Sequence, residues 1–475
     1  MTARAILGLV VLNLGVLAVG AALLWGIAGT RRWAELLRLG GVAYFLGLAS
    51  LLVVLTAELI VGIPFGVTSL VLSAGATFAG GVVLGRLRGH APPRLGGPDR
   101  TVLSPAVALL IVPILLLFAA LFRATRLQPL DDVDAWWVWT IRAKALFYFG
   151  DLGGSELVRG DITNYPSYPP GVSLVQAQAF DAMGGTDTVT LHLQHWFLAV
   201  GFVYAVVGLL LPRVRPFILF PFVLLLLVMP GFVDRVVTAR ADSLMGYFVA
   251  IAALLLCIRL EDGSRWPLVV AAVLLAGAML TKREAAALVL CVVVAAVVTS
   301  FRTWRWSRRW VAAAAGVGLA LAIPWRVSLM LADTRDAPSE GYFAALDHPE
   351  RALPSLGLVA RTIFDPMWLG LGALTVIGAT LALAVGARRL PIFVLLTFAT
   401  TAAAWSFVIW TETGFPITPE PTQNPVIRMV LALLLVVAPL TPMLFEEAWR
   451  AVTTPASRDP ARRSSASGVP ARQPA

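Results

Sequence analysis

The chain has 475 residues, of which 59% are hydrophobic and 13% are charged. Soluble globular domains carry about 25% charged residues, so this composition excludes an ordinary soluble protein and indicates a polytopic membrane protein. The net charge of +10 does not indicate a nucleic-acid partner, because the arginines lie in short loops between apolar segments, where they set membrane orientation.

The lengths of the apolar runs predict the helices that cross the membrane. Crossing about 30 Å of hydrocarbon takes a helix of roughly 20 residues, and this rule predicts about thirteen spans. These are 5–28, 39–62, 65–85, 101–122, 189–211, 215–233, 241–260, 266–280, 285–300, 311–331, 364–386, 391–410 and 426–445. The first has no small-residue cleavage site, so we expect a retained helix and not a signal peptide. The predicted fold is an all-α polytopic membrane protein with one transmembrane domain over residues 1–445.

The positions of the arginines predict the orientation. The short Arg-rich loops fall on one side of the membrane, and such loops are typically cytoplasmic. The N-terminus would then lie outside and the C-terminus inside, with a large outer loop at 123–188 and a second at 332–363. Residues 446–475 would form a cytoplasmic tail, disordered where Ser, Pro, Ala and Arg dominate, because that composition cannot bury enough apolar surface.

The stretch from Asp131 to Phe149 holds three carboxylates, three tryptophans and two cations between apolar runs. We predict a helix that lies flat at the outer membrane surface, with Asp131 or Asp132 capping its first turn. One face of this helix would carry Asp134, Trp137, Ile141 and Lys144. The alternative is a Trp-anchored surface helix whose acids only cap and solubilise it.

Further polar residues stand at the predicted outer ends of other spans. Tyr165 to Gly171 form a Pro-rich turn that opens a helix; its free amides could hold a phosphate, although an ordinary Pro-started helix explains the prolines alone. Arg240 and Asp242 precede a span and, being two residues apart, do not share a helix face. We therefore expect each to face a polar cavity or the interface.

The turn that holds Lys282 and Arg283 joins two short spans on the outer side, where the positive-inside rule makes these cations atypical. They either line a cavity or extend to lipid headgroups. Arg428 lies about one turn inside the last span and could hold a phosphate or reach headgroups in the same way. His192 and His195 have no further ligands nearby in the sequence, which favours packed, hydrogen-bonded histidines over a zinc site.

Motifs for other chemistries are missing from the sequence. Cys257 and Cys291 lie inside apolar segments, which predicts packing residues and neither a disulfide framework nor a metal site. The sequence also lacks a Walker loop, a dinucleotide-binding glycine fingerprint and an HExxH motif. ATP-driven transport by this chain is therefore not supported.

Several of these motifs, in this order, resemble the multi-spanning GT-C glycosyltransferases, and in particular bacterial members distantly related to the enzymes that use dolichyl- or polyprenyl-phosphate-mannose. The motifs are Asp134-Ala-Trp with Trp139 and Arg142-Ala-Lys-Ala-Leu, then Tyr165-Pro-Ser-Tyr-Pro-Pro, Ala241-Asp242 and Thr281-Lys-Arg-Glu. The resemblance covers Leu127 to Glu284. It implies an enzyme of the bacterial cytoplasmic membrane that takes a sugar from a polyprenyl-phosphate donor at the outer surface. The sugar would pass to a hydroxyl of a glycan, lipid or protein acceptor.

The resemblance also implies roles for individual residues. The catalytic acid of the first outer loop would be Asp134, with Asp132 as second choice because the Asp-rich run departs from the simpler family pattern. Glycosyl transfer passes through an oxocarbenium-like state, so a carboxylate accepts the acceptor's proton while cations neutralise the departing lipid phosphate. The candidate residues for binding the donor phosphate or substrate are Lys282, Arg240, Arg428, Lys144, Asp242, Glu284 and Tyr168. A divalent cation is compatible with the Asp cluster, but nothing in the sequence specifies one.

Two other classes of function stay open. A secondary transporter or flippase for lipid-linked sugars would also carry charges near the membrane, but such proteins often show internal repeats and mid-membrane charges in broken helices. A catalytically silent scaffold would use the Asp-rich helix as an anchor. The polar groups gather at one outer face and no repeat is detectable, which favours the transferase.

Overall fold

A computed structural model of the chain describes residues 2–95, 105–128, 130, 132–152, 165–300, 305–332, 347–411 and 425–453. In these ranges the backbone forms helices, turns and one isolated bridge between Arg32 and Arg94. The predicted all-α polytopic fold is confirmed. Asp131, parts of both predicted outer loops and the tail beyond Thr453 lie outside the described residues.

The helices follow one another along the chain with short connections wherever the structure describes them. They are α1 (Ala3–Ala28), α2 (Trp33–Arg38), α3 (Gly40–Ile60), α4 (Val67–Leu87), α5 (Pro105–Leu127), η1 (Ala135–Thr140), α6 (Ile141–Phe149), α8 (Gly171–Met183), α9 (Thr188–Leu210), α10 (Pro216–Val228), α11 (Pro230–Val237), α12 (Ala241–Asp262), α13 (Trp266–Met279), α14 (Ala285–Ser300), α15 (Arg305–Leu331), η2 (Pro349–Arg351), α17 (Ala352–Ile363), η3 (Pro366–Trp368), α18 (Leu371–Ala384), α19 (Arg389–Thr411), α20 (Pro425–Val437) and α21 (Thr441–Thr453).

Most predicted spans coincide with long apolar helices. Nine helical segments among the described residues are long and apolar enough to cross a membrane, and the bent pair α10 and α11 makes a tenth if it is counted as one span. The shorter apolar helices α13, α14 and α18 would all have to cross as well to reach thirteen. The count of thirteen therefore stays a prediction.

Three predicted boundaries differ from the structure. The span predicted at 215–233 bends by 63° between α10 and α11, where Pro230 starts a new helix because proline lacks the amide that would continue the old one. The span predicted from residue 364 begins at Leu371, after the amphipathic helix α17. Part of the predicted tail is helical, because α21 extends to Thr453.

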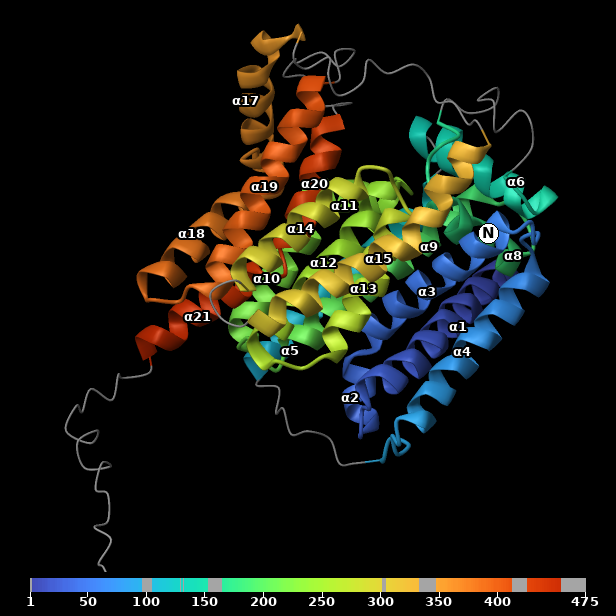
Figure 1. Ribbon diagram of the computed structural model, residues 1–475, viewed down its shortest axis with the longest axis horizontal. Coiled ribbons are helices and arrows are strands. Elements are labelled where there is room, and N and C mark those ends of the chain that lie inside the picture. Colours follow the sequence, from blue (N-terminus) through green and yellow to red (C-terminus); the bar gives the residue numbers. More distant parts are fainter. Residues whose placement is uncertain are drawn as a thin grey trace, which may run out of the picture.

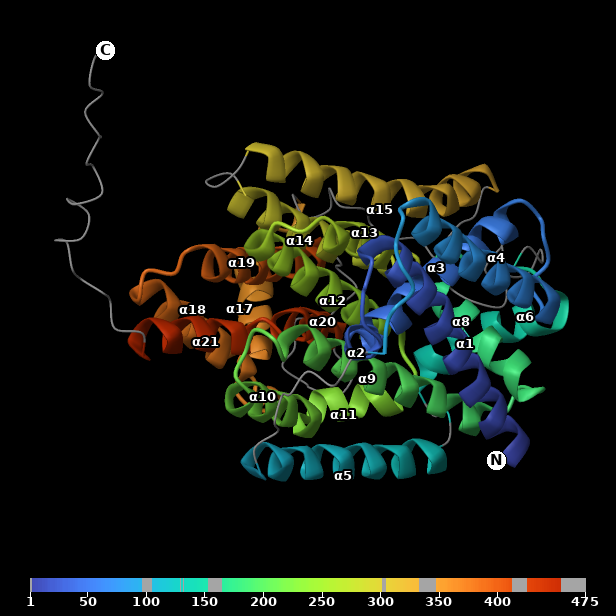
Figure 2. The same ribbon diagram turned by 90° about the horizontal axis from the view of Figure 1, so that it is seen from below.

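The core of the bundle is formed by α12 and α20, which are almost entirely buried, whereas α4 and α5 expose most of their surface. Figure 2 shows α5 and α15 on opposite outer faces, with α12 and α20 between them. Small residues allow close packing: a Cβ on Gly20 of α1 would lie 1.6 Å from the Ala43 carbonyl oxygen of α3. Backbones that approach this closely gain dispersion contacts that lipid cannot supply.

The helix bundle has two ends, which we call the loop end and the tail end (Figure 1). The loop end holds α6, α8 and the start of α1, and the tail end holds α2 and α21. A Cβ on Gly8 of α1 would lie 1.9 Å from the Ala182 carbonyl oxygen, so the first helix packs directly on α8. The N-terminus and the first large loop thus lie at the same end, as the sequence predicted; which side of the membrane this end faces stays a prediction.

Candidate active site

The first large loop is attached to the bundle through the start of α8. The amide of Gly171 donates a 2.7 Å hydrogen bond to the carbonyl of Leu280, at the break between α13 and α14. A Cβ at this position would lie 2.4 Å from the same carbonyl oxygen, so only glycine allows the contact. Two prolines, Pro169 and Pro170, precede Gly171, and their fixed φ angle suits the residues at the start of a helix. This contact brings the Pro-rich turn beside the turn that contains Lys282.

The Asp-rich stretch begins a π-helix instead of the regular α-helix that was predicted. Asp132 Oδ1 caps it by accepting a hydrogen bond from the Ala135 amide at 3.0 Å, and the π-helical turns extend from Ala135 to Thr140. Each residue of a π-helix advances by a smaller angle than in an α-helix, so the one-turn intervals predicted from Asp134 to Lys144 do not apply between Ala135 and Thr140. None of the four residues predicted to share a face is buried, and the shared face itself stays a prediction. Trp139 points inward and is 1% exposed.

Side chains of α8 hold the π-helix in place. Ser173 Oγ donates to the Trp139 carbonyl at 3.1 Å, and Thr140 Oγ1 donates to Gln176 Oε1 at 3.0 Å. Gln176 Nε2 also donates to the Ala239 carbonyl at 3.5 Å, just before α12. Sequence reasoning gave Ser173 and Gln176 no role at the site; the signal for them is a short run of polar side chains, with Gln178, on a mostly apolar helix whose first ten residues are all buried.

The centre of the site is Asp242, in the first turn of α12. Its side chain is 1% exposed and binds two cations: Oδ1 accepts from Lys282 Nζ at 2.8 Å, and Oδ2 accepts from Arg428 Nε at 3.0 Å. Lys282 comes from the α13–α14 break and Arg428 from the first turn of α20. One buried carboxylate therefore fixes two cations that are far apart in the sequence.

Two further carboxylates lie just before the π-helix: Asp134 joins this cluster, and Asp132 forms a neighbouring ion pair. Arg428 Nη1 binds Asp134, and Arg240 Nη2 binds Asp132, both in close contact. Arg240 and Asp242 thus point to different partners, as their spacing along the helix requires. The side chain of Asp134 is 35% exposed, whereas that of Asp132 is 8% exposed. Asp134 is the more accessible of the two acids.

An aromatic wall borders the ion pairs. Tyr168 donates a 3.5 Å hydrogen bond to Glu284 Oε1, and the same oxygen lies 3.5 Å from Lys282 Nζ. The Arg283 guanidinium covers the Tyr168 ring at 4.6 Å, and the Trp139 ring lies 5.1 Å from it on another side. Burial and the Glu284 carboxylate raise the pKa of Tyr168 above its usual range, so the phenol stays protonated.

The structure places eight of the nine predicted site residues in ion pairs or hydrogen bonds with one another. Six are linked by continuous contacts and two form a neighbouring pair. We call the whole set the ionic network: Asp134, Tyr168, Asp242, Lys282, Glu284 and Arg428, with the pair Asp132 and Arg240. Lys144 is half-buried on α6 and makes no ion pair with any described residue. His192 and His195 are buried on α9, where His192 Nδ1 lies 3.0 Å from the Thr188 carbonyl.

A metal ion would need a group of unpaired ligands. In the part of the chain that the structure describes, no three His, Cys, Asp or Glu side chains gather into a metal-binding cluster. The network carboxylates Asp132, Asp134 and Asp242 instead bind arginine or lysine. The chemistry available from these residues is proton transfer by a carboxylate and binding of an anion by cations.

Comparison with known proteins agrees with the resemblance drawn from the sequence. Residues 168–327 match the family of dolichyl-phosphate-mannose-protein mannosyltransferases, which is a GT-C family. The match begins at Tyr168 and includes Arg240, Asp242 and Lys282, and it ends before Arg428. No curated protein and no solved structure matches the chain.

Proposed function

We propose that the protein is a membrane glycosyltransferase that moves a sugar from a polyprenyl-phosphate donor to an acceptor hydroxyl. The observation that carries this proposal is the ionic network at the loop end, in which a partly exposed carboxylate pairs with one of the two cations that a buried aspartate holds. Such a pairing of an accessible acid with preorganised cations suits a reaction that releases a phosphate. The family match supports the same class of reaction.

The donor phosphate would bind Arg428 and Lys282. Both cations are anchored on Asp242, so their positions are fixed before the substrate arrives. Hydrogen bonds between ionised groups are about twice as strong as neutral ones, and a water-poor site strengthens them further. The lipid tail would remain in the membrane beside the loop end.

Asp134 is the better candidate for the base. Asp242 is buried between two cations, and Asp132 both caps the π-helix and binds Arg240, so neither is free to reach an acceptor. Asp134 is the most exposed of the three and has one ion-pair partner among the described residues, Arg428. A donor phosphate that binds Arg428 would compete for that partner and leave the Asp134 carboxylate open to the acceptor.

The transfer step follows from these positions. The acceptor oxygen forms a bond with the anomeric carbon while the bond from that carbon to the phosphate oxygen breaks. The acceptor proton moves to the Asp134 carboxylate, and the released polyprenyl phosphate keeps the bonding electrons. Arg428 and Lys282 neutralise the charge that develops on the phosphate in the transition state.

The remaining members of the ionic network would support this arrangement. Arg240 and Asp132 fix the start of the π-helix and with it the position of Asp134. Glu284 would hold Lys282 within the turn that they share, and Tyr168 would hold Glu284 from the loop side. We propose further that the loop end faces the outside of a bacterial cytoplasmic membrane, with the C-terminus inside, in line with the arginine distribution.

The test is transfer by the purified protein with a panel of polyprenyl-phosphate sugars and acceptors. Replacing Asp134 with asparagine keeps the side-chain shape but removes the base, and loss of a general base lowers the rate by about 10²–10⁴. Asp347→Asn is the matched control, because Asp347 is an exposed carboxylate outside the ionic network. We expect it to leave the rate unchanged.

Two outcomes would contradict the proposal. Transfer that persists within a few-fold in Asp134→Asn would remove Asp134 from the role of base. Failure of every donor, combined with movement of the lipid-linked sugar between leaflets of a vesicle, would favour a flippase.

A further inference from the structure

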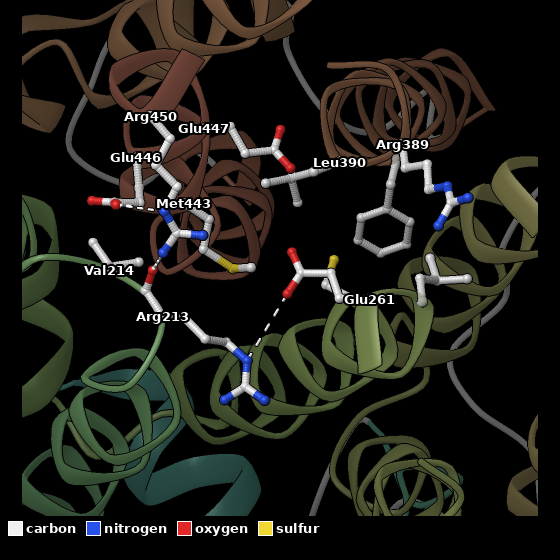
Figure 3. A pocket seen from close by; sticks show the side chains of 12 residues that line it. Arg213, Val214, Glu261, Arg389, Leu390, Met443, Glu446, Glu447 and Arg450 are labelled. Atoms are coloured by element: carbon white, nitrogen blue, oxygen red, sulfur yellow. Dashed lines mark hydrogen bonds and ion pairs between the residues drawn. The ribbon is translucent and has the colours of Figure 1, made fainter. Parts of the chain in front are cut away.

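A second set of charged side chains surrounds a cavity at the tail end, remote from the ionic network. The two sites are connected by α12: Asp242 lies in its first turn and Glu261 in its last, about 29 Å apart at a rise of 1.5 Å per residue. The cavity has a volume of about 420 Å³, within the range of small-molecule sites (Figure 3). Its charged lining residues are Arg213, Glu261, Arg389, Glu446, Glu447 and Arg450.

One side of the cavity offers positive charge. Arg389 is the first residue of α19, is exposed, and makes no ion pair with any described residue. The first amides of a helix lack helical acceptors and carry partial positive charge, so they favour an anion. Arg450 differs, because its Nε already binds Glu446 Oε1 at 2.7 Å. Arg389 is therefore the cation available to a ligand.

The other side offers two carboxylates, one of which has a buried oxygen that lacks a donor in the part of the chain that the structure describes. Glu447 Oε2 is buried and has no hydrogen-bond partner among the described residues. Among the described residues Glu261 has one ion-pair contact, with Arg213 Nε at 3.9 Å, which is too long for a hydrogen bond, and its side chain is 37% exposed. Figure 3 shows the side chains of Glu261 and Glu447 extending into the space between α12 and α21. A buried acceptor without a donor costs free energy, so a bound N–H group would stabilise this wall.

The formal charges of the side chains that line the cavity balance. Three arginines face three glutamates. An anionic ligand would leave an excess negative charge in a partly enclosed space, and a simple cation would leave an excess positive charge. A ligand that carries both charges and is neutral in total satisfies both walls.

We propose that this cavity binds the headgroup of a phospholipid that carries a phosphate and a primary ammonium, as in phosphatidylethanolamine. The phosphate would contact Arg389 and the first turn of α19, and the ammonium would donate to Glu447 and Glu261. A quaternary ammonium, as in phosphatidylcholine, has no N–H group and cannot supply a donor to Glu447. The apolar side chains of Leu390 and Phe393, which also line the cavity, would contact the glycerol and upper acyl region.

The test is native mass spectrometry of the purified full-length protein after incubation with equal amounts of phosphatidylethanolamine, phosphatidylcholine and phosphatidylglycerol. Phosphatidylethanolamine can donate hydrogen bonds to the glutamates and phosphatidylcholine cannot. A hydrogen bond to a charged group is strong enough to predict that phosphatidylethanolamine is retained roughly ten-fold more than phosphatidylcholine. Glu447→Gln and Arg389→Gln should each reduce the retention of phosphatidylethanolamine, and Glu447→Gln should also remove most of its preference. Arg388→Gln is the matched control, because Arg388 is exposed and does not line the cavity.

Several results would overturn the assignment. Equal retention of phosphatidylethanolamine and phosphatidylcholine would show that the ammonium N–H groups are not recognised. Preferential retention of phosphatidylglycerol would indicate a site for anions alone. If no lipid were retained, the cavity would not be a phospholipid site and the proposal would be rejected. Arg389 is exposed, so Arg389→Gln should fold and tests the phosphate contact even if Glu447→Gln does not; retention unchanged in Arg389→Gln would also reject the proposal.

Discussion

Asp242 should be the most sensitive residue of the ionic network. Asparagine at this position would leave Lys282 and Arg428 without the carboxylate that now lies 2.8 Å and 3.0 Å from their nitrogens. Lys282 is 5% exposed, so water cannot replace the lost partner. Removing one partner of a buried ion pair destabilises proteins by about 3–5 kcal/mol, and here one substitution disrupts two pairs. We expect Asp242→Asn to lose at least that much.

The assay is the free energy of unfolding in mixed detergent micelles, measured together with transfer activity. Asp262→Asn is the control on the same helix, because Asp262 is 46% exposed and binds Arg213 at the surface. Surface pairs contribute about 0–1 kcal/mol, so the control should change stability little. Adding Lys282→Met to Asp242→Asn should restore part of the loss, since it removes the buried cation that has lost its nearest carboxylate. A loss below about 1 kcal/mol in Asp242→Asn would refute the argument that Asp242 holds both cations.

Three other predictions concern the docking of α8, the pH dependence of stability and the orientation in the membrane. Gly171→Ala should cost about 1–3 kcal/mol and lower transfer, because its Cβ would lie 2.4 Å from the Leu280 carbonyl oxygen; unchanged unfolding and activity would contradict the docking. Burial raises the pKa of Asp181 to about 6. The folded-state pKa thus exceeds the unfolded value of about 4, so the stability from protonated Asp181 is complete below about pH 4 and is lost as the pH rises through about 6. Because Asp181 is only half-buried, we expect wild type to lose about 1 kcal/mol relative to Asp181→Asn over that range, and parallel pH curves would refute this. For orientation, cysteine at exposed Leu353 should react with an impermeant thiol reagent from outside the cell and cysteine at Arg388 should not; the reverse pattern would invert the topology.

Background labelling should be low because the two native cysteines are both buried. They serve as an internal check, because reagent that reacts with wild type would indicate an unfolded fraction. The labelling can therefore be compared directly between the two engineered positions.

The sequence by itself determined the class of fold and the end of the bundle at which the polar groups lie. Apolar runs of about 20 residues cannot avoid the membrane, and a charge at the end of such a run must lie near the boundary. Asp134, Arg240, Lys282 and Arg428 each stand at such an end, which is why their common location was predictable.

Only the tertiary structure decided which charges meet. Asp242 binds Lys282 and Arg428, 40 and 186 residues away, and no local pattern encodes pairs at such separations. The position of a cation at the end of an apolar run also does not show whether it extends to lipid headgroups or binds a buried carboxylate. Packing of α12 against α13 and α20 makes that choice, because it encloses Asp242 where only a cation can compensate its charge.

The same reasoning explains the two features that the sequence missed. The π-helix at Ala135–Thr140 is held by Ser173 and Gln176 of α8, so its geometry depends on contacts across a loop and not on its own residues. The tail-end cavity arises where α12, α19 and α21 meet, and its unpaired Glu447 is indistinguishable in sequence from any surface glutamate. Hydrophobic length is a property of one segment, whereas the pairing of charges is a property of the packed bundle.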